Sequence, residues 1–322
     1  MNFAPAAEEK ALVASLTEAL TRVCSPVRVR AWEAEQVSFD DAFLAAIRQG
    51  GYLEAGLAFG DCPSFGVLVQ LAEVAGRVLA PPLFSWQAAY AAFLLDAHPL
   101  ARRIAAGEVL APVVPGRSNL VLSDGRLNGS ADGVPFVDKA QTLLLPLPLG
   151  EGRGEGSQIA LVPTSETEVQ LVTTQSLVPQ WKLTFTQTEA ELVPGQAGRY
   201  EQALDRLRAS LAAWSTGAGG RAIDLASAYG CAREQFGHPV GSYQSVQNRL
   251  VDAAIQVEEA RMLVYRAAAL IDAGQPEAGS VALLARRQAD KAFVQASRAA
   301  LLTFGGYGFT VDFDIQLYFR RS

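Results

Sequence analysis

The segment from Arg233 to Gln247 (REQFGHPVGSYQSVQ) contains side chains that could hold a nucleotide-like ligand. Arg233 offers a planar, permanently charged guanidinium whose fork suits a phosphate oxygen. Phe236 can pack on a flat ring, and Gln235 and Gln244 can form hydrogen bonds with the same ligand. Together these side chains could hold a ligand that carries both a phosphate group and a flat ring.

A second segment, GGYGFT, begins at Gly305. Gly305 and Gly306 let a backbone approach a ligand closely, because no Cβ stands in the way. Each residue alone has a plainer interpretation: Arg233 as a cation at a helix C-terminus, and the glycine pair as a helix cap and turn. Their joint occurrence favours a binding site, because a bare helical bundle has no reason to combine them.

The composition argues against several other classes of function. The formal net charge of -6 and the pI near 5.1 argue against nucleic acid as a main partner. The only histidines are His98 and His238, so neither a catalytic triad nor a histidine metal site is expected. The three cysteines are widely spaced and form no CxxC pair, so we expect buried thiols in a reducing cytoplasm at Cys24, Cys62 and Cys231.

Residues 1–107 are predicted to form an N-terminal helical domain. Apolar residues recur at helical spacing from Ala6 to Val23. Ser38 is the expected cap of a second helix, which ends at Gly50-Gly51. Further helices are expected over residues 65–79, 86–95 and 99–106.

Residues 108–197 have a pattern that predicts a small β domain, either a barrel or a sandwich. Short apolar runs between turns predict strands at residues 120–122, 142–145, 159–162, 169–172 and 183–185. The run from Pro146 to Gly156 alternates glycines without apolar periodicity, so we expect a mobile hairpin excursion. A phosphate-binding loop is the alternative there, but no helix start follows the glycines.

Long helices are predicted again in residues 198–322, over 198–231, 244–273 and 278–304, with a short one over 314–321. Short connections predict antiparallel neighbours in a C-terminal four-helix bundle. The expected fold class is therefore α+β, with helices, a small β domain and a helical bundle in that order. We find neither a signal peptide nor an uncharged apolar run of membrane-spanning length, so a cytoplasmic protein without a membrane span is expected.

The two glycine-containing segments together resemble the acyl-CoA dehydrogenase family. The first is similar to the family's R-x-x-F-G-x-P-(x)n-Q signature between two long helices. The second is similar to its G-G-x-G-[YF]-T turn after the following helix. The stretch from Glu73 to Pro81 (EVAGRVLAP) is like the family's E-x-x-G-R stretch, and the layout of the whole chain also fits.

This resemblance implies a cofactor, a substrate and partners. The positions that would grip the adenosine-diphosphate end of FAD are Arg233, Gln235, Phe236, Gln244, Gly305 and Gly306. In the family the flavin of that FAD lies mainly in the neighbouring subunit, so a dimer or a dimer of dimers is implied. An acyl-CoA substrate and an electron-transfer flavoprotein as electron acceptor are also implied.

The carboxylate that removes the α-proton of the thioester in this family has no counterpart at its usual positions. One position lies on the long helix before Arg233 and falls at Leu207, with Asp205 and Arg208 nearby. The other lies in a loop beyond the final Arg pair, after the last residue of the sequence. Asp312 or Asp314 could substitute, although their plain interpretation is helix capping and solvation.

The β domain departs from the family as well. The family's T-E-x-x-x-G-S-D-like stretch contacts flavin and substrate, whereas residues 111–119 read APVVPGRSN. Leu302 stands where a glutamine is expected, and Trp181 is interpreted as a core residue.

The division between kept and lost motifs predicts a non-catalytic-type subunit of a heteromeric acyl-CoA dehydrogenase. Such enzymes are used in bacterial breakdown of steroid side chains and similar bulky acyl-CoAs. The chain would contribute FAD contacts at a heterodimer interface, and its partner would supply the base. Two alternatives stay open: a self-sufficient homo-oligomeric dehydrogenase with an unusual base such as Asp312, and a non-enzymatic scaffold that binds no flavin.

Overall fold

The computed structural model describes residues 7–57, 64–95, 98–114, 118–147, 158–172, 178–195 and 198–322. The chain forms two compact units. The helical unit comprises Met1–Val29, Ser64–Pro82 and Arg208–Ser322, and the mixed unit comprises Arg30–Pro63 and Leu83–Leu207. Among the described residues, no helix combines the length and the apolar character that crossing a membrane requires.

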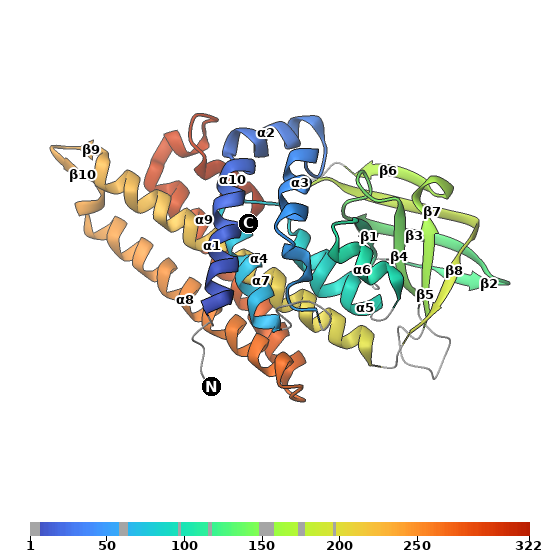
Figure 1. Ribbon diagram of the computed structural model, residues 1–322. Helices are drawn as coiled ribbons and strands as arrows, with labels where there is room; N and C mark the ends of the chain where they lie inside the picture. The colour runs from blue at the N-terminus through green and yellow to red at the C-terminus, as the bar shows by residue number, and fades with distance from the viewer. Residues whose placement is uncertain are drawn as a thin grey trace. The chain divides into compact units, whose positions relative to one another are not determined.

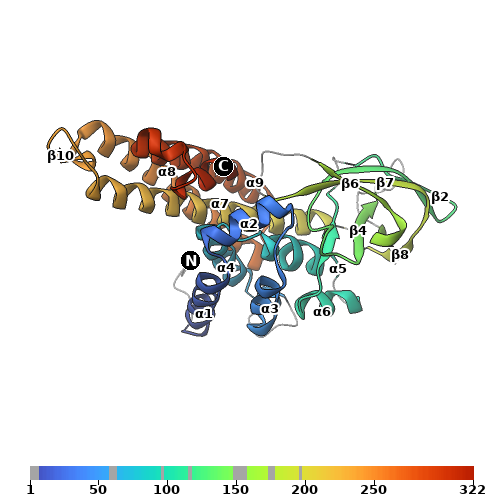
Figure 2. The same cartoon turned by 90° about the horizontal axis from the view of Figure 1, so that it is seen from above.

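Long helices build the helical unit (Figures 1 and 2). They are α1 (Ala7–Val23), α4 (Phe65–Arg77), α7 (Arg199–Ala232, which enters this unit at Arg208), α8 (Gln244–Asp272), α9 (Ala278–Phe304) and α10 (Ile315–Arg321). A tight turn at Gly274, whose φ is 60°, leads from α8 into its antiparallel neighbour α9. Alanines dominate the buried faces of this pair, among them Ala253, Ala260, Ala289 and Ala296, so the two backbones can lie close together.

Two glycines allow α4 and α7 to cross in near contact. A Cβ added at Gly76 would lie 1.9 Å from the carbonyl oxygen of Trp214. A Cβ added at Gly217 would lie 2.0 Å from the carbonyl oxygen of Glu73. The indole N–H of Trp214 donates to the Ala80 carbonyl oxygen at 2.8 Å, so this crossing is fixed by hydrogen bonding as well as by packing.

Charged side chains join α4 to α7 and α8 beside this crossing. Arg261 donates to one carboxylate oxygen of Glu73 at 2.7 Å, and the Tyr265 hydroxyl donates to the other at 2.8 Å. Burial, followed by the nearby charge of Glu73, raises the pKa of Tyr265 well above its ordinary value. Arg77 pairs with Asp224 at 2.6 Å. The E-x-x-G-R stretch therefore holds α4 in the helical unit.

The mixed unit combines short helices with two four-stranded sheets. The helical elements are α3 (Asp41–Gln49), η1 (Tyr52–Glu54), the π-helix η2 (Phe84–Ala92), α5 (Phe93–Leu95) and α6 (Pro99–Ala105), and α2 (Pro26–Glu35) leads into the unit.

The first sheet has the strand order β1-β4-β5-β8, with β1 (Leu110–Pro112), β4 (Thr142–Leu147), β5 (Gln158–Pro163) and β8 (Glu191–Pro194). The second has the order β2-β3-β7-β6, with β2 (Val121–Ser123), β3 (Arg126–Val134), β7 (Gln180–Glu189) and β6 (Glu168–Val172). Neighbouring strands are antiparallel except for the parallel pair β1 and β4.

Apolar side chains from both sheets share one core. Leu127 and Phe185 come from the second sheet, and Leu143 and Val162 come from the first. The sheets therefore face each other as a small sandwich. Trp181 is 6% exposed in the same core, which confirms its interpretation as a core residue. The predicted α+β fold is confirmed.

Most predicted helices and strands are present, but several elements, among them α2, β1 and β8, are missing from the prediction. Helix α2 has no apolar stripe, and β1 and β8 are too short to show a periodic pattern. The expected cap of α3 is wrong, because Asp40 caps it by accepting from the Phe43 backbone N–H at 2.9 Å. The Ser38 hydroxyl instead donates to Asp138 at 2.6 Å, a residue far along the chain.

The structure describes two of the three cysteines and only the start of the glycine-rich run. Cys24 is buried as predicted, whereas the prediction for Cys231 is wrong, because this residue is exposed in the last turn of α7. Cys62 lies outside the described residues. So does most of the run from Pro146 to Gly156, whose first two residues end strand β4. The division into three domains stays a prediction.

Candidate functional site

The Arg233 segment forms a small two-stranded hairpin at the end of α7. Strand β9 (Glu234–Gln235) pairs with β10 (His238–Pro239), and the two residues between them have positive φ, 55° at Phe236 and 80° at Gly237. Hairpin turns with two such residues match the right-handed twist of the flanking strands. Phe236 is 94% exposed at the tip, so a large aromatic ring is held in solvent in a backbone conformation that it disfavours.

The glycine turn follows directly on α9. Gly305 caps this helix with φ of 63° and ψ of -139°, a conformation open essentially only to glycine. A Cβ built at Gly305 or Gly306 would meet no atom within 4 Å, so both glycines face open space. Gly308 is required for a different reason, because its Cβ would lie 2.8 Å from the Leu301 carbonyl oxygen.

An arginine–aromatic contact brings these two segments together. The guanidinium carbon of Arg233 lies 5.4 Å from the centre of the Tyr307 ring. Tyr307 packs edge-on against Phe313, which belongs to an aromatic cluster with Phe304 and Tyr229. Because Tyr229 lies on α7 and Phe304 on α9, the cluster fixes Arg233 beside the glycine turn.

The remaining predicted residues lie on the hairpin and at the start of α8. The Gln235 carbonyl oxygen accepts from the Tyr243 hydroxyl at 2.9 Å, and its side-chain amide donates to the Glu234 carbonyl oxygen at 2.7 Å. Gln244 is the exposed first residue of α8. Among the described residues, no hydrogen bond, ring–ring contact or cation–π contact joins Phe236 or Gln244 to the glycine turn.

The donors of this surface suit an anionic, ring-bearing ligand. Arg233 supplies a fixed cation with N–H donors, Gln244 supplies an amide, and the N-terminus of α8 supplies unsatisfied backbone N–H groups. Phosphate groups bind favourably where such backbone groups and a cation meet. Gly305 and Gly306 leave room beside them for an approaching group.

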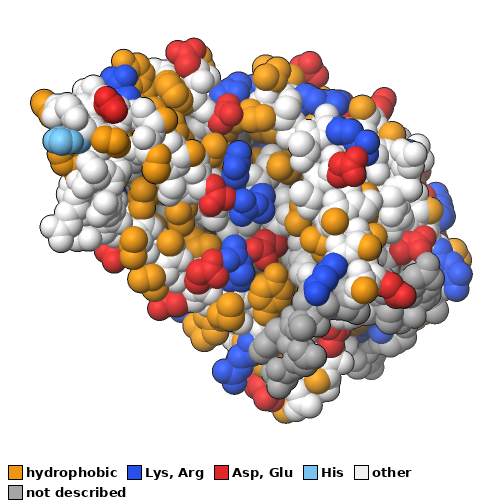
Figure 3. Space-filling view, turned by 60° about the vertical axis from the view of Figure 1, so that its left-hand side comes forward, with side chains coloured by type: hydrophobic (Ala, Val, Ile, Leu, Met, Phe, Trp, Pro, Cys, Tyr) orange, Lys and Arg blue, Asp and Glu red, His pale blue; other side chains and the backbone are white. Residues whose placement is uncertain are grey.

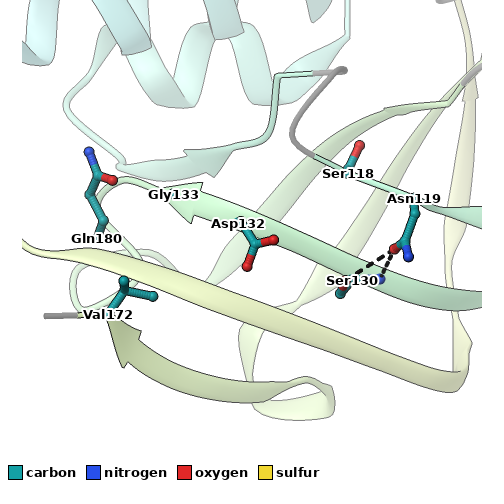
Figure 4. A pocket seen from close by; sticks show the side chains of 7 residues that line it. All are labelled: Ser118, Asn119, Ser130, Asp132, Gly133, Val172 and Gln180. Atoms are coloured by element: carbon teal, nitrogen blue, oxygen red, sulfur yellow. Dashed lines mark hydrogen bonds between the residues drawn. The ribbon is translucent and has the colours of Figure 1, made fainter. Parts of the chain in front are cut away.

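A second candidate feature is an open pocket on the sheet β2-β3-β7-β6 (Figure 4). Its volume is about 610 Å³. Five of the seven described lining residues have polar side chains; the seven are Ser118, Asn119, Ser130, Asp132, Gly133, Val172 and Gln180. Asn119 accepts from the Ser130 backbone N–H at 2.6 Å and from its hydroxyl at 3.1 Å. The residue types alone gave no signal for this pocket, because its members come from four separated segments.

Asn119 also explains a glycine in β3. Gly129 has φ of 122°, and a Cβ there would lie 2.4 Å from the Asn119 carbonyl oxygen. The carboxylate of Asp132 lies between the Asn119–Ser130 pair and Gln180 in Figure 4. The described lining therefore carries one acid and no lysine or arginine.

Comparison with known proteins finds similarity to one family of enzymes. Residues 198–322 match the family described as "Acyl-CoA dehydrogenase, C-terminal domain". The chain is 36% identical over 119 residues to the probable acyl-CoA dehydrogenase FadE25 of Mycobacterium tuberculosis, covering 37% of this chain and 31% of FadE25. It is 33% identical over 172 residues to the acyl-CoA dehydrogenase IpdE2 of Mycolicibacterium smegmatis, covering 52% and 53%. The chain thus aligns with about a third to a half of these relatives' lengths.

A solved structure extends the similarity to nearly the whole chain. The steroid ACAD named Tcur3481-Tcur3483, a G363A variant, superposes with a TM-score of 0.86 at 25% identity, covering 98% of this chain and 91% of that one. Residues 198–322 thus match the acyl-CoA dehydrogenase family, and nearly the whole chain has the fold of such an enzyme. The hairpin, the glycine turn and the E-x-x-G-R stretch that carry the sequence resemblance are thus parts of an acyl-CoA dehydrogenase fold.

At the position expected for the catalytic base of an acyl-CoA dehydrogenase, this chain has a buried apolar residue. Leu207 is 5% exposed on α7. Asp312 is exposed after the glycine turn, and Asp314 stands at the N-cap position of α10, where its side chain accepts no capping hydrogen bond. Leu302, at the position of the family's glutamine, is 47% exposed.

The stretch that replaces the acyl-CoA dehydrogenase T-E-x-x-x-G-S-D motif divides into two parts. Its start, from Ala111, belongs to β1 and is buried in the sandwich. Its end, Ser118 and Asn119, lines the pocket of Figure 4. Residues 115–117 lie outside the described part of the chain.

Proposed function

We propose that this chain is a subunit of an FAD-dependent acyl-CoA dehydrogenase, which desaturates an acyl-CoA thioester between its α and β carbons. The chain contributes contacts for the adenosine-diphosphate end of an FAD whose flavin lies at a partner's active site. One observation carries the proposal: Arg233 and the glycine turn meet on an exposed surface, while Leu207 closes the position of the catalytic base.

The residues on this surface fit that part of FAD by their chemistry. Arg233 would pair with the diphosphate, and Gln235 and Gln244 would donate or accept hydrogen bonds. Phe236 would pack on the adenine ring. Gly305 and Gly306 would let the cofactor approach the backbone closely, because neither has a Cβ. When bound, the flavin accepts the hydride equivalent from the β-carbon of the substrate.

The exposure of these groups supports a two-chain site. Phe236 is 94% exposed and Tyr307 is 51% exposed, so both offer apolar surface that only a ligand or another chain can cover. The steroid ACAD with a similar fold bears the names of two proteins, Tcur3481 and Tcur3483. We therefore assign the base and the flavin-side contacts to a partner acyl-CoA dehydrogenase chain. An electron-transfer flavoprotein would reoxidise the flavin.

A bulky acyl-CoA, of the steroid side-chain type, is the substrate class that we propose. The support is the similarity to the steroid ACAD over 98% of this chain. The polar pocket around Asp132 belongs to the chain's own sandwich, and its acidic lining would repel a phosphate. We therefore place no flavin phosphate there.

The test compares the chain alone with the chain co-expressed with a neighbouring dehydrogenase-like gene. Flavin absorbance gives FAD per chain, and native mass gives the assembly. We expect flavin only in the mixed complex, below one FAD per chain. A yellow homo-oligomer with one FAD per chain and activity on an acyl-CoA would contradict the proposal. In that event Asp312→Asn would abolish turnover, whereas in the mixed complex it should leave turnover unchanged. A complex that stays colourless with excess FAD would indicate a scaffold.

A further inference from the structure

The pocket of Figure 4 lies on the outer face of the sheet β2-β3-β7-β6. Side chains alternate between the two faces of a strand. On β3, Ala131 and Val134 are buried in the core of the sandwich, whereas Ser130 and Asp132 line the pocket. The pocket is therefore open to solvent and separate from the apolar core.

A β-bulge at Asp132 and Gly133 shapes this pocket. The pairing of β3 with β7 shifts between Ala131 and Val134, so Asp132 and Gly133 stand opposite one residue of β7, Lys182. Gly133 has φ of 68° and adds no side chain to the space beside the Asp132 carboxylate. In the described part of the chain, Lys182 forms no ion pair with Asp132 and does not line the pocket.

Four polar side chains of the pocket keep free hydrogen-bonding groups. Asn119 uses its Oδ1 to accept from the Ser130 backbone N–H and hydroxyl, at 2.6 Å and 3.1 Å. Its Nδ2 has no acceptor among the described residues and keeps two N–H donors. Within the same ranges, the side chains of Ser118, Asp132 and Gln180 form no hydrogen bond or ion pair. The pocket thus offers one carboxylate, two amide groups and one hydroxyl to a ligand.

These groups select for a positively charged ligand with oxygen acceptors. A carboxylate only accepts hydrogen bonds, so Asp132 suits an ammonium group. The amides of Asn119 and Gln180 can donate to hydroxyl or carbonyl oxygens. A phosphate or carboxylate ligand would be repelled by Asp132, and the described lining has no lysine or arginine to offset the repulsion. The volume of about 610 Å³ admits a ligand of monosaccharide size or larger.

The polar lining distinguishes this pocket from the exposed surface of the helical unit. Figure 3 brings forward the side where α8 and the hairpin lie in Figure 1, and hydrophobic side chains gather there in a band. Such a band is typical of a surface that contacts another protein. In the pocket, Val172 is the only apolar side chain of the described lining. A small polar molecule therefore fits the pocket better than a protein chain does.

We propose that the pocket binds a small organic amine that also carries hydroxyl or carbonyl oxygens. The ammonium group pairs with Asp132, the oxygens accept from Asn119 and Gln180, and the carbon skeleton contacts Val172. The proposed FAD contacts lie in the helical unit, whereas every residue of this pocket belongs to the mixed unit. The amine is therefore a second ligand, which needs neither FAD nor the proposed partner chain.

Amine probes and their N-acetylated forms test the charge requirement. Glucosamine and ethanolamine carry an ammonium group beside a hydroxyl, whereas N-acetylglucosamine and N-acetylethanolamine keep the hydroxyl and lose the charge. Saturation-transfer NMR on the flavin-free chain measures binding at a mildly acidic pH, where both amines are protonated. We expect at least one amine to bind about 10-fold or more tightly than its acetylated form, because acetylation removes a charge-assisted contact. If neither amine bound more tightly than its acetylated form, the proposal would be overturned.

Three variants locate the binding in this pocket. Asp132→Asn keeps the shape of the side chain and removes its charge, so amine affinity should fall about 10-fold, to that of the acetylated form. Gln180→Leu removes an amide without changing the charge and should weaken the amine and its acetylated form equally. Asp124→Asn is the matched control, because it removes an exposed acid in the turn between β2 and β3, and both affinities should stay unchanged.

Thermal melting shows whether the variants keep the fold, which is expected because Asp132 and Asp124 are exposed. Full amine affinity in a folded Asp132→Asn chain, or an equal loss in Asp124→Asn, would mean that the amine does not bind at Asp132. Because flavin is absent throughout, failure here does not bear on the proposed FAD contacts.

Discussion

The Arg233 guanidinium lies over the Tyr307 ring, 5.4 Å from its centre, although one residue follows α7 and the other follows α9. This contact joins a cation to a turn in which two successive glycines, Gly305 and Gly306, leave open space beside the backbone. Arginine is suited to both tasks, since its planar group can stack on a ring while its edge donates to a phosphate.

Replacing Arg233 should weaken FAD binding in the assembled complex without unfolding the chain. Arg233→Met removes a charge-assisted contact and should raise the dissociation constant of FAD by roughly 10- to 100-fold. Arg233→Lys should recover only part of the lost FAD affinity, because an ammonium group neither stacks on a ring nor forms two parallel hydrogen bonds with a phosphate. Equilibrium dialysis of FAD measures both. Arg22→Met, at an exposed helical position, is the matched control and should bind FAD normally.

The two successive glycines should behave differently when each is replaced by alanine. Gly305→Ala forces an L-residue to φ of 63° and ψ of -139°, which should lower the free energy of unfolding by about 1–3 kcal/mol. Gly306→Ala meets open space and has no positive φ, so stability should stay near wild type. If Gly306 admits FAD, its alanine variant should still lose flavin. Denaturant titration and flavin content distinguish the two effects, and normal flavin content in the Gly306→Ala complex would remove Gly306 from the site.

Phe236→Asn should separate the stability of the hairpin from its function. The variant contains the Asn-Gly pair that such turns prefer, so the chain alone should be as stable as wild type or more stable by about 0.5 kcal/mol. The complex should nevertheless bind FAD or the partner chain more weakly, because the exposed ring is gone. Thermal melting of the chain alone and native mass of the complex give the two readouts. A destabilised chain with an intact complex would mean that the ring serves only its own hairpin.

Alanine at the α4–α7 crossing should be strongly destabilising. Gly76→Ala or Gly217→Ala places a Cβ about 2 Å from a carbonyl oxygen of the other helix. The helices must separate, at a cost of about 3 kcal/mol. Gly220→Ala, on the same face of the fold, meets only the ends of Arg261 and Arg77 side chains at 3.4 Å and 3.6 Å. Gly220→Ala should therefore change the free energy of unfolding little. If all three variants lost the same stability, the close contact between α4 and α7 would not be the cause.

Local patterns were enough to predict most of the fold. Glycines that end helices mark the limits of α3, α8 and α9, and the apolar stripe marks α1. What local patterns miss is decided by distant residues. Ser38 looks like a cap, yet its hydroxyl is taken by Asp138, whose place beside it depends on the tertiary fold. The π-helical hydrogen bonding of η2 also has no counterpart in a hydrophobic pattern.

In the candidate site, too, the sequence predicts some residues, whereas others are brought together only by the tertiary fold. Arg233 and the glycine pair are visible as motifs, because their chemistry depends on residue type. Tyr307 lies inside the second motif, but its contact with Arg233 follows from the aromatic cluster that joins α7 to α9. The pocket of Figure 4 shows no motif, since strands β3, β6 and β7 and the segment before β2 each supply only one to three residues.

The segmentation of the helical unit has a consequence for how the protein is made on the ribosome. Helices α1 and α4 pack on each other and are synthesised early, whereas α8, which packs on α4, is completed only at Asp272. Chains are synthesised at about 5–20 residues per second, so α4 waits roughly ten to forty seconds for this cover. Leu68 and Leu71 of α4, both fully buried in the finished fold, lack part of their packing during that interval. The mixed unit, which closes at Leu207, can complete its sandwich while the rest of the chain is still being translated.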